Sequence, residues 1–145
     1  MKGGKTCQVL LVDDNPADLD LFRDVLSSDG REPDVNTAGD GEEAIAFLLR
    51  SGKFQHATRP DLVILDLNLP RRDGRSVLSH VKSNPELRRI PIVVFTTSIS
   101  GKDIADCYAL GANCYVSKPG CLEDFRSTVQ SIGHFWLGVA RLGAE

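Results

Sequence analysis

The stretch from residue 62 to residue 70, LVILDLNLP, decides the fold. Its first four residues are aliphatic with no polar alternation, which is typical of a strand buried on both faces in a parallel sheet. Pro70 has no N–H for a sheet and RRDG at 71–74 favours a turn, so the strand should end soon after Asp66. Parallel α/β sheets bind ligands at that end. Asp66 is therefore placed to react, although a single acid there can also be merely solvated.

The composition is that of an ordinary globular domain. Of 145 residues, 41% are hydrophobic and 26% charged. The chain is long enough to bury a core without disulfides or structural metals. We predict one domain over 1–145, with a core of about 6–131 and an extended C-terminal helix over about 121–141. The net charge of -3 and the lack of a membrane-length or signal-like apolar run predict a cytoplasmic protein that binds no nucleic acid or membrane directly.

Cysteine and histidine do not form a recognisable site. The cysteines show no C-x-x-C pair and no histidine-spaced ligand pattern, so small buried hydrophobic residues are the better interpretation. None of the histidines lies beside a Ser or Cys in a nucleophile arrangement. The residues concerned are Cys7, Cys107, Cys114, Cys121, His56, His80 and His134.

Strands and helices alternate along the chain. Besides the central strand, the sequence predicts strands at residues 7–12, 90–95 and 113–117 and a weaker one at residues 33–38. Caps at Asn15, Asp40 and Ser100 begin helices, and further helical patterns follow residue 74 and residue 121. About five alternations predict an α/β, doubly wound, five-stranded parallel sheet with helices on both faces. Right-handed crossovers leave few topologies, and the commonest has strand order 2-1-3-4-5.

In that order, polar residues at four strand ends surround one crevice. Asp13, Asp14 and Asp66 should converge, with Thr96 on one side and Lys118 on the other. Three clustered carboxylates repel one another and need a cation. Oxygen ligands without sulfur favour Mg²⁺. Lys118 adds a fixed ammonium group and a hydroxyl can donate to the same oxygens, so the set is typical of phosphoryl transfer to a carboxylate.

Four motifs on these strand ends match one known family. They are DDNP at 13–16, LDLNLP at 65–70, TTS at 96–98 and YVSKP at 115–119. In this order they resemble the receiver domain of two-component response regulators, over nearly the whole chain. The resemblance implies a flavodoxin-like (CheY-like) fold and a single receiver domain that takes a phosphoryl group from a histidine kinase. It also implies a protein that catalyses its own phosphorylation and dephosphorylation without being an enzyme in the ordinary sense.

Site roles follow from the matched positions. The resemblance implies that Asp66 is the phosphoacceptor and that Asp13 and Asp14 are the acid pair. Asp14 would bind Mg²⁺ directly and Asp13 through water, with the backbone carbonyl of Asn68 as a further ligand. Lys118 would hold the phosphoryl group. The family's switch positions, a hydroxyl and an aromatic residue that rotates inward after phosphorylation, are matched by Thr96 and Tyr115.

A narrower resemblance concerns partners. The segments DGEEA, LPRRDGR, NCYVSKP and FWL are similar to those of stand-alone regulators paired with bacterial and cyanobacterial phytochromes. The kinase would then be phytochrome-type, and the signal would leave by contact with a downstream protein or phosphotransfer partner. Surplus apolar residues around Trp136 predict a homodimer through the face made by the fourth helix, fifth strand and fifth helix. A tail folded back on its own domain would explain them equally well.

Three other functions remain open at this level. An aspartyl-phosphate phosphatase shares a nucleophile at a strand end, but its motif has a second acid where this chain has Asn68. A flavin-binding electron carrier has a similar sheet, but the loop after its first strand should be rich in Ser, Thr and Gly rather than Asp13-Asp14. A phosphorylation-independent binding module would not need the acids, lysine and hydroxyl together.

Overall fold

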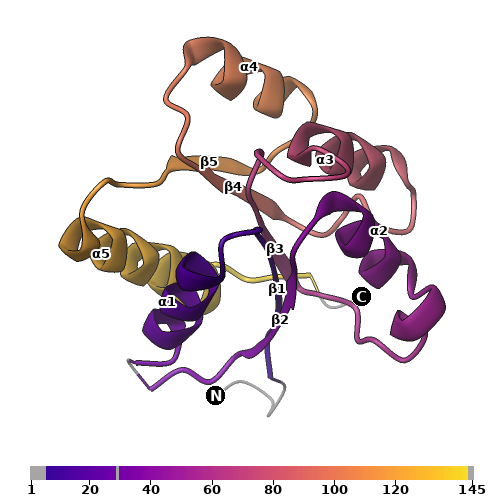
Figure 1. Cartoon of the computed structure of the whole chain (residues 1–145). Coiled ribbons are helices and arrows are strands. Elements are labelled where there is room, and N and C mark those ends of the chain that lie inside the picture. The colour runs from indigo at the N-terminus through magenta and orange to yellow at the C-terminus, as the bar shows by residue number, and fades with distance from the viewer. Residues whose placement is uncertain (1–5, 29, 144–145) are drawn as a thin grey trace.

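The computed structural model describes residues 6–28 and 30–143, so residues 1–5, 29 and 144–145 of the predicted domain lie outside the described part. A five-stranded parallel sheet forms its centre, with strand order β2-β1-β3-β4-β5 (Figure 1). The predicted fold class and strand order are confirmed. The strands are β1 (Gln8–Val12), β2 (Asp34–Ala38), β3 (Leu62–Leu65), β4 (Ile92–Thr96) and β5 (Cys114–Ser117).

Helices cover both faces of the sheet. Helices α1 and α5 pack together on one face, and α2 and α3 lie on the other, where α4 also buries Cys107 (Figure 1). Predicted caps at Asn15, Asp40 and Ser100 each accept a hydrogen bond from a backbone N–H of the first turn. The helices are α1 (Pro16–Leu26), α2 (Gly41–Leu49), α3 (Gly74–Ser83), α4 (Gly101–Ala109) and α5 (Leu122–Gly133), with a 3₁₀ turn, η1 (Gly52–Phe54).

The central strand β3 is covered from both sides. All four of its residues are buried, and their side chains alternate between two separate apolar clusters, one on each face of the sheet. The register of β3 is therefore strongly constrained, because a shift of one residue would move each side chain to the opposite apolar cluster. The N–H of Asp66 donates to the carbonyl of Val12 at 2.9 Å, which fixes the end of β3 beside the end of β1.

The C-terminal segment differs from a single long helix. The α-helix ends at Gly133, and a π-helical segment, η2 (His134–Val139), continues the chain. Trp136 and Leu137 pack against the same apolar cluster as α1 and α5, while Phe135 and Val139 stay exposed. The wider π turn fits this division, since the tail partly folds onto its own domain. None of the helices in the described residues is long and apolar enough to cross a bilayer.

Candidate functional site

Three carboxylates meet at the carboxyl ends of β1 and β3. Asp13 and Asp14 follow β1 and Asp66 follows β3; one carboxylate oxygen from each lies within 4.8 Å of the others. Asp13 and Asp66 are buried, with 8% and 7% of their surface exposed, and Asp14 is exposed. The structure thus brings together the three acids that the sequence placed in one crevice.

Backbone donors fix the two buried carboxylates. The N–H of Asn15 donates to Oδ1 of Asp13 at 3.0 Å, and the N–H of Asn68 donates to Oδ1 of Asp66 at 3.2 Å. In both acids the second oxygen, Oδ2, remains directed to the same ammonium group. Asn68 itself is exposed in the loop after β3, two residues from Asp66. Its backbone carbonyl was predicted to be a further metal ligand.

That ammonium group belongs to Lys118, which directly follows β5. Its Nζ lies 2.7 Å from Oδ2 of Asp13 and 3.1 Å from Oδ2 of Asp66, and its side chain is only 5% exposed. The Nζ also lies 5.8 Å from the centre of the Phe95 ring, within cation–π range. Its backbone N–H donates to the carbonyl of Thr96, which continues the β4–β5 pairing up to the site.

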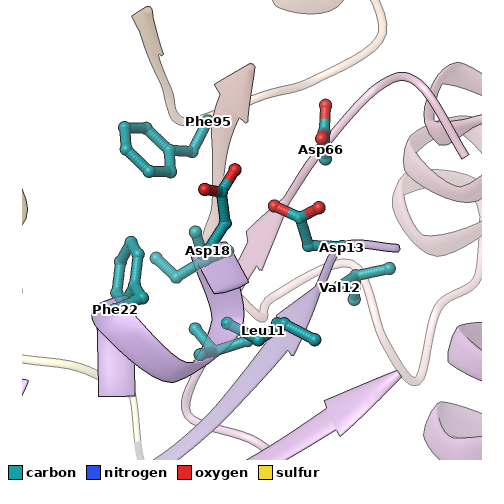
Figure 2. Close-up of a pocket in the computed structure, with 9 residues that line it drawn as sticks. Leu11, Val12, Asp13, Asp18, Phe22, Asp66 and Phe95 are labelled. Carbon is teal, nitrogen blue, oxygen red and sulfur yellow. The ribbon is translucent and has the colours of Figure 1, made fainter. Parts of the chain in front are cut away.

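Sequence reasoning missed one member of this cluster. Asp18, in the first turn of α1, places Oδ2 2.9 Å from Nζ of Lys118. Figure 2 shows its carboxylate in the same pocket as those of Asp13 and Asp66, with the rings of Phe22 and Phe95 on the other side. The available signal was its position two residues after a proline-led helix start, since early helix side chains point back toward the strand end.

Burial and the contacts within the cluster shift two pKa values. Burial raises the pKa of Asp13 above its ordinary value, although hydrogen bonds from Lys118 and the backbone of Asn15 oppose the change. Burial alone would lower the pKa of Lys118, but hydrogen bonds to Asp13 and Asp18 outweigh it, and the net shift is upward. Lys118 is therefore charged throughout the physiological range.

Thr96 and Tyr115, the two expected switch residues, differ in their hydrogen bonding. Thr96, the last residue of β4, is fully buried, and its Oγ1 has no hydrogen-bond partner among the described residues. Such an orphaned hydroxyl is costly unless a ligand completes it. The hydroxyl of Tyr115 donates to the carbonyl of Ser98 at 2.9 Å.

Ser98 ties this region to two helices. Its hydroxyl donates to Oδ2 of Asp103 at 2.5 Å, and Arg75 of α3 pairs with the other oxygen of the same carboxylate. The hydrogen bond from Ser98, and then the pairing with Arg75, lower the pKa of Asp103 against the effect of burial. The loop after β4 is thereby connected to α3, α4 and β5.

The donor set fits a hard divalent cation. The cluster offers carboxylate oxygens and contains no cysteine or histidine. Such a set favours magnesium, manganese or calcium over zinc. Three carboxylates contact one ammonium group and Asp14 lies beside them, so a divalent cation would reduce the remaining repulsion. The cluster therefore has the donor atoms to bind such a cation.

Comparison with known proteins identifies this arrangement. Residues 9–130 match the model of the response regulator receiver domain. The chain belongs to that family. Response regulator Rcp1 of Synechocystis sp. is 43% identical over 136 residues, which cover 94% of this chain and 92% of Rcp1. The Mn²⁺-bound structure of Rcp1 superposes with a TM-score of 0.92, covering 95% of this chain and 99% of that one.

A second solved structure extends the similarity. The phosphorylated cyanobacterial phytochrome response regulator RcpA is 44% identical, with a TM-score of 0.93, covering 97% of this chain and 100% of that one. This receiver domain is thus homologous to phytochrome response regulators and fits the role of a two-component response regulator, with a histidine kinase as partner. Receiver domains bind a divalent metal at an acidic pocket, and the cluster of Asp13, Asp14 and Asp66 has that character.

Proposed function

We propose that this regulator accepts a phosphoryl group on Asp66 from a histidine kinase in the presence of Mg²⁺. The observation that carries the proposal is the contact of 3.1 Å between Nζ of Lys118 and Oδ2 of Asp66, inside a pocket that gathers two more acids. The proposed unit is a single receiver domain over 1–145, with its core at about 6–131 and a C-terminal extension. Its proposed location is the cytoplasm.

The transfer is a substitution at phosphorus. An Asp66 carboxylate oxygen forms a bond to phosphorus while the phosphorus–nitrogen bond of the phosphohistidine breaks, and the electron pair of that bond returns to the imidazole. Lys118 neutralises charge on the phosphoryl oxygens, and the free hydroxyl of Thr96 donates to one of them. Mg²⁺, held by Asp13, Asp14, Asp66 and the carbonyl of Asn68, would supply positive charge to the same oxygens.

Hydrolysis of the acyl phosphate would use the same pocket. Water attacks phosphorus, its proton leaves to solvent, and the bond between phosphorus and the Asp66 oxygen breaks to restore the carboxylate. We propose that the protein accelerates both reactions in this way. Lys118 and Thr96 act in both phosphotransfer and hydrolysis, because each contacts the phosphoryl oxygens rather than the incoming or leaving group.

Phosphorylation adds about -1.5 to -2 charges and new acceptor oxygens beside Thr96. We propose that Thr96 and Tyr115 transmit this change as a switch. The hydroxyl of Tyr115 bonds to the carbonyl of Ser98, two residues from Thr96, so a movement of Thr96 would change this hydrogen bond. The output would be a change of the α4–β5–α5 surface, recognised by a downstream protein or a phosphotransfer partner.

We propose a phytochrome-type kinase as the phosphodonor. This rests on the similarity to RcpA, whose whole resolved chain aligns with this one at 44% identity. A panel of purified kinases, with and without a phytochrome photosensor, tests it: the phytochrome-type kinase should label the protein fastest.

Replacing Asp66 with asparagine should abolish phosphorylation. The amide keeps the size of the side chain but has no anionic oxygen to form the acyl phosphate. The measurement is Mg²⁺-dependent incorporation of labelled phosphate from a kinase or a small phosphodonor. Asp20→Asn is the matched control, because it removes the same charge from an exposed position of α1 and should leave labelling intact. Label on the Asp66→Asn protein would contradict the assignment. Absence of label on wild type would instead favour a phosphorylation-independent binding module.

We also propose a homodimer through the α4–β5–α5 face. The support is a group of exposed apolar side chains on or next to it: Ile99, Tyr108 and Leu122 are 79%, 49% and 63% exposed. Static light scattering of the concentrated wild-type protein should give twice the mass of the chain. Leu122→Asp should give the monomer mass, while Leu49→Asp, at an exposed position of α2, should not change the dimer. A monomeric wild type would refute the dimer.

A further inference from the structure

We infer that Asp18 is a positioning residue for Lys118 that keeps the ammonium group against Asp66 during phosphoryl transfer. The inference rests on the proposed function and adds a residue to it. Its basis is the 2.9 Å contact between Oδ2 of Asp18 and Nζ of Lys118, across 100 residues of sequence. The Asp18 side chain is 26% exposed, so its carboxylate forms the solvent side of the lysine's surroundings.

The start of α1 releases Asp18 for this contact. An acid at the third helical position ordinarily accepts a hydrogen bond from a backbone N–H just before the helix. Here the N–H of the cap residue Asn15 is taken by Oδ1 of Asp13 instead. Asp18 is left with oxygens that can turn to Lys118.

Helix α2 provides an internal comparison. Its acid at the same helical position, Glu43, accepts a hydrogen bond from the backbone N–H of Gly39 at 2.7 Å, just before the cap Asp40. That acid serves its own helix end. Asp18 occupies the same position in α1 but contacts Lys118, the residue after β5, so it does not act as an ordinary helix cap.

The number of donors on Lys118 makes the third acid matter. An ammonium group has three N–H donors, and Nζ has three carboxylate partners: Asp13, Asp18 and Asp66. Asp13 and Asp66 belong to the acidic cluster that can bind a metal, and Asp66 is the proposed phosphoacceptor. Asp18 lies outside that cluster. Of the three partners, Asp18 is the one whose oxygens would bind neither the metal nor the phosphoryl group.

A lysine has a flexible four-carbon stem, and holding it costs side-chain entropy. The contact with Asp18 and the approach to the Phe95 ring restrain Nζ before the phosphodonor arrives. Without Asp18, one N–H would turn to water and the ammonium group would sample positions away from Asp66. Pre-positioned charge contributes more to transfer than charge that must reorganise.

Two variants of Asp18 and one control test this role. Asp18→Ala removes charge and acceptor, while Asp18→Asn keeps one acceptor oxygen. Asp20→Ala removes an exposed acid of the same helix. The first measurement is the NMR signal of the Lys118 ammonium group, assigned by its absence in Lys118→Met. Its hydrogen exchange should be slow in wild type and Asp20→Ala, faster in Asp18→Asn and fastest in Asp18→Ala.

The second measurement is the rate of phosphorylation by acetyl phosphate with Mg²⁺. We expect Asp18→Ala to be slower than wild type by about tenfold, Asp18→Asn to lie between them, and Asp20→Ala to match wild type. An unchanged ammonium signal in Asp18→Ala, or a rate equal to or above that of wild type, overturns the inference. Absence of wild-type phosphorylation would overturn the proposed function, and the ammonium signal would still decide whether Asp18 positions Lys118.

Discussion

Replacing Lys118 with methionine should destabilise the metal-free protein by about 3–5 kcal/mol at neutral pH, the usual cost of removing one partner from a buried ion pair. Methionine fills the space of the lysine stem but leaves the carboxylates of Asp13 and Asp66 without a cation. Both are nearly inaccessible, with side chains 11% and 8% exposed, so water can replace little of the lost pairing.

The loss should depend on pH in a defined direction. Burial already raises the folded-state pKa of Asp13 above its ordinary 3.8, and removing Lys118 raises it further. A carboxyl group with a raised folded pKa binds its proton more tightly when folded, so stability falls as pH rises from 3.8 through the folded value. In wild type, the raised pKa of Lys118 contributes stability that is lost only above 10.5. Acidification from pH 7 should therefore reduce the difference between the two proteins.

Urea unfolding followed by the fluorescence of Trp136, the single tryptophan, measures both effects. Lys82→Met is the control, because Nζ of Lys82 donates to the carbonyls of Arg88 and Ile90 rather than to carboxylates. Its stability loss should not vary with pH over the same range. Added Mg²⁺ should stabilise Lys118→Met more than wild type, since binding to the folded state alone raises stability. Equal losses at pH 7 and pH 4.5 would show that the carboxylates do not depend on Lys118.

Sequence patterns predicted the sheet because most of its strands are short apolar runs with an identifiable end. The LVIL run predicts β3, Pro70 and the turn after it predict where the chain leaves the sheet, and Asp66 lies at that boundary. Strand order then followed from few allowed topologies. The convergence of Asp13, Asp14 and Asp66 follows in turn, because parallel strands present the same end to one edge.

Features set by three-dimensional contacts were not predictable in this way. Asp18 reads as an ordinary first-turn acid until the N–H of Asn15 is found to be occupied by Asp13. The hydrogen bond of the Tyr115 hydroxyl depends on a carbonyl, that of Ser98, which a sequence does not orient. The change from α5 to a π helix at His134 has no signal in the sequence, because the helical periodicity of residues 122–139 continues across it.

Replacing Gly74 with alanine should destabilise the protein by about 3 kcal/mol and slow phosphorylation roughly 100-fold. Gly74 is the first residue of α3. A Cβ there would lie 2.6 Å from Cα of Leu67 and closer still to the carbonyl oxygen of Asp66. Both obstacles are backbone atoms, which cannot move aside by a change of rotamer. The strain must shift the segment that carries the proposed phosphoacceptor, and small displacements of a reacting group are costly.

Gly101→Ala is the matched control for this strain. Gly101 is also the first residue of a helix, α4, but a Cβ there would have nothing within 4 Å. Since alanine favours helix more than glycine does, this variant should be as stable as wild type or slightly more so. Urea midpoints and acetyl phosphate rates of the two variants, measured together, separate helix propensity from contact. If Gly74→Ala behaved like Gly101→Ala, the approach of α3 to the Asp66 backbone would not constrain the site, because the chain would have relaxed without moving the acid.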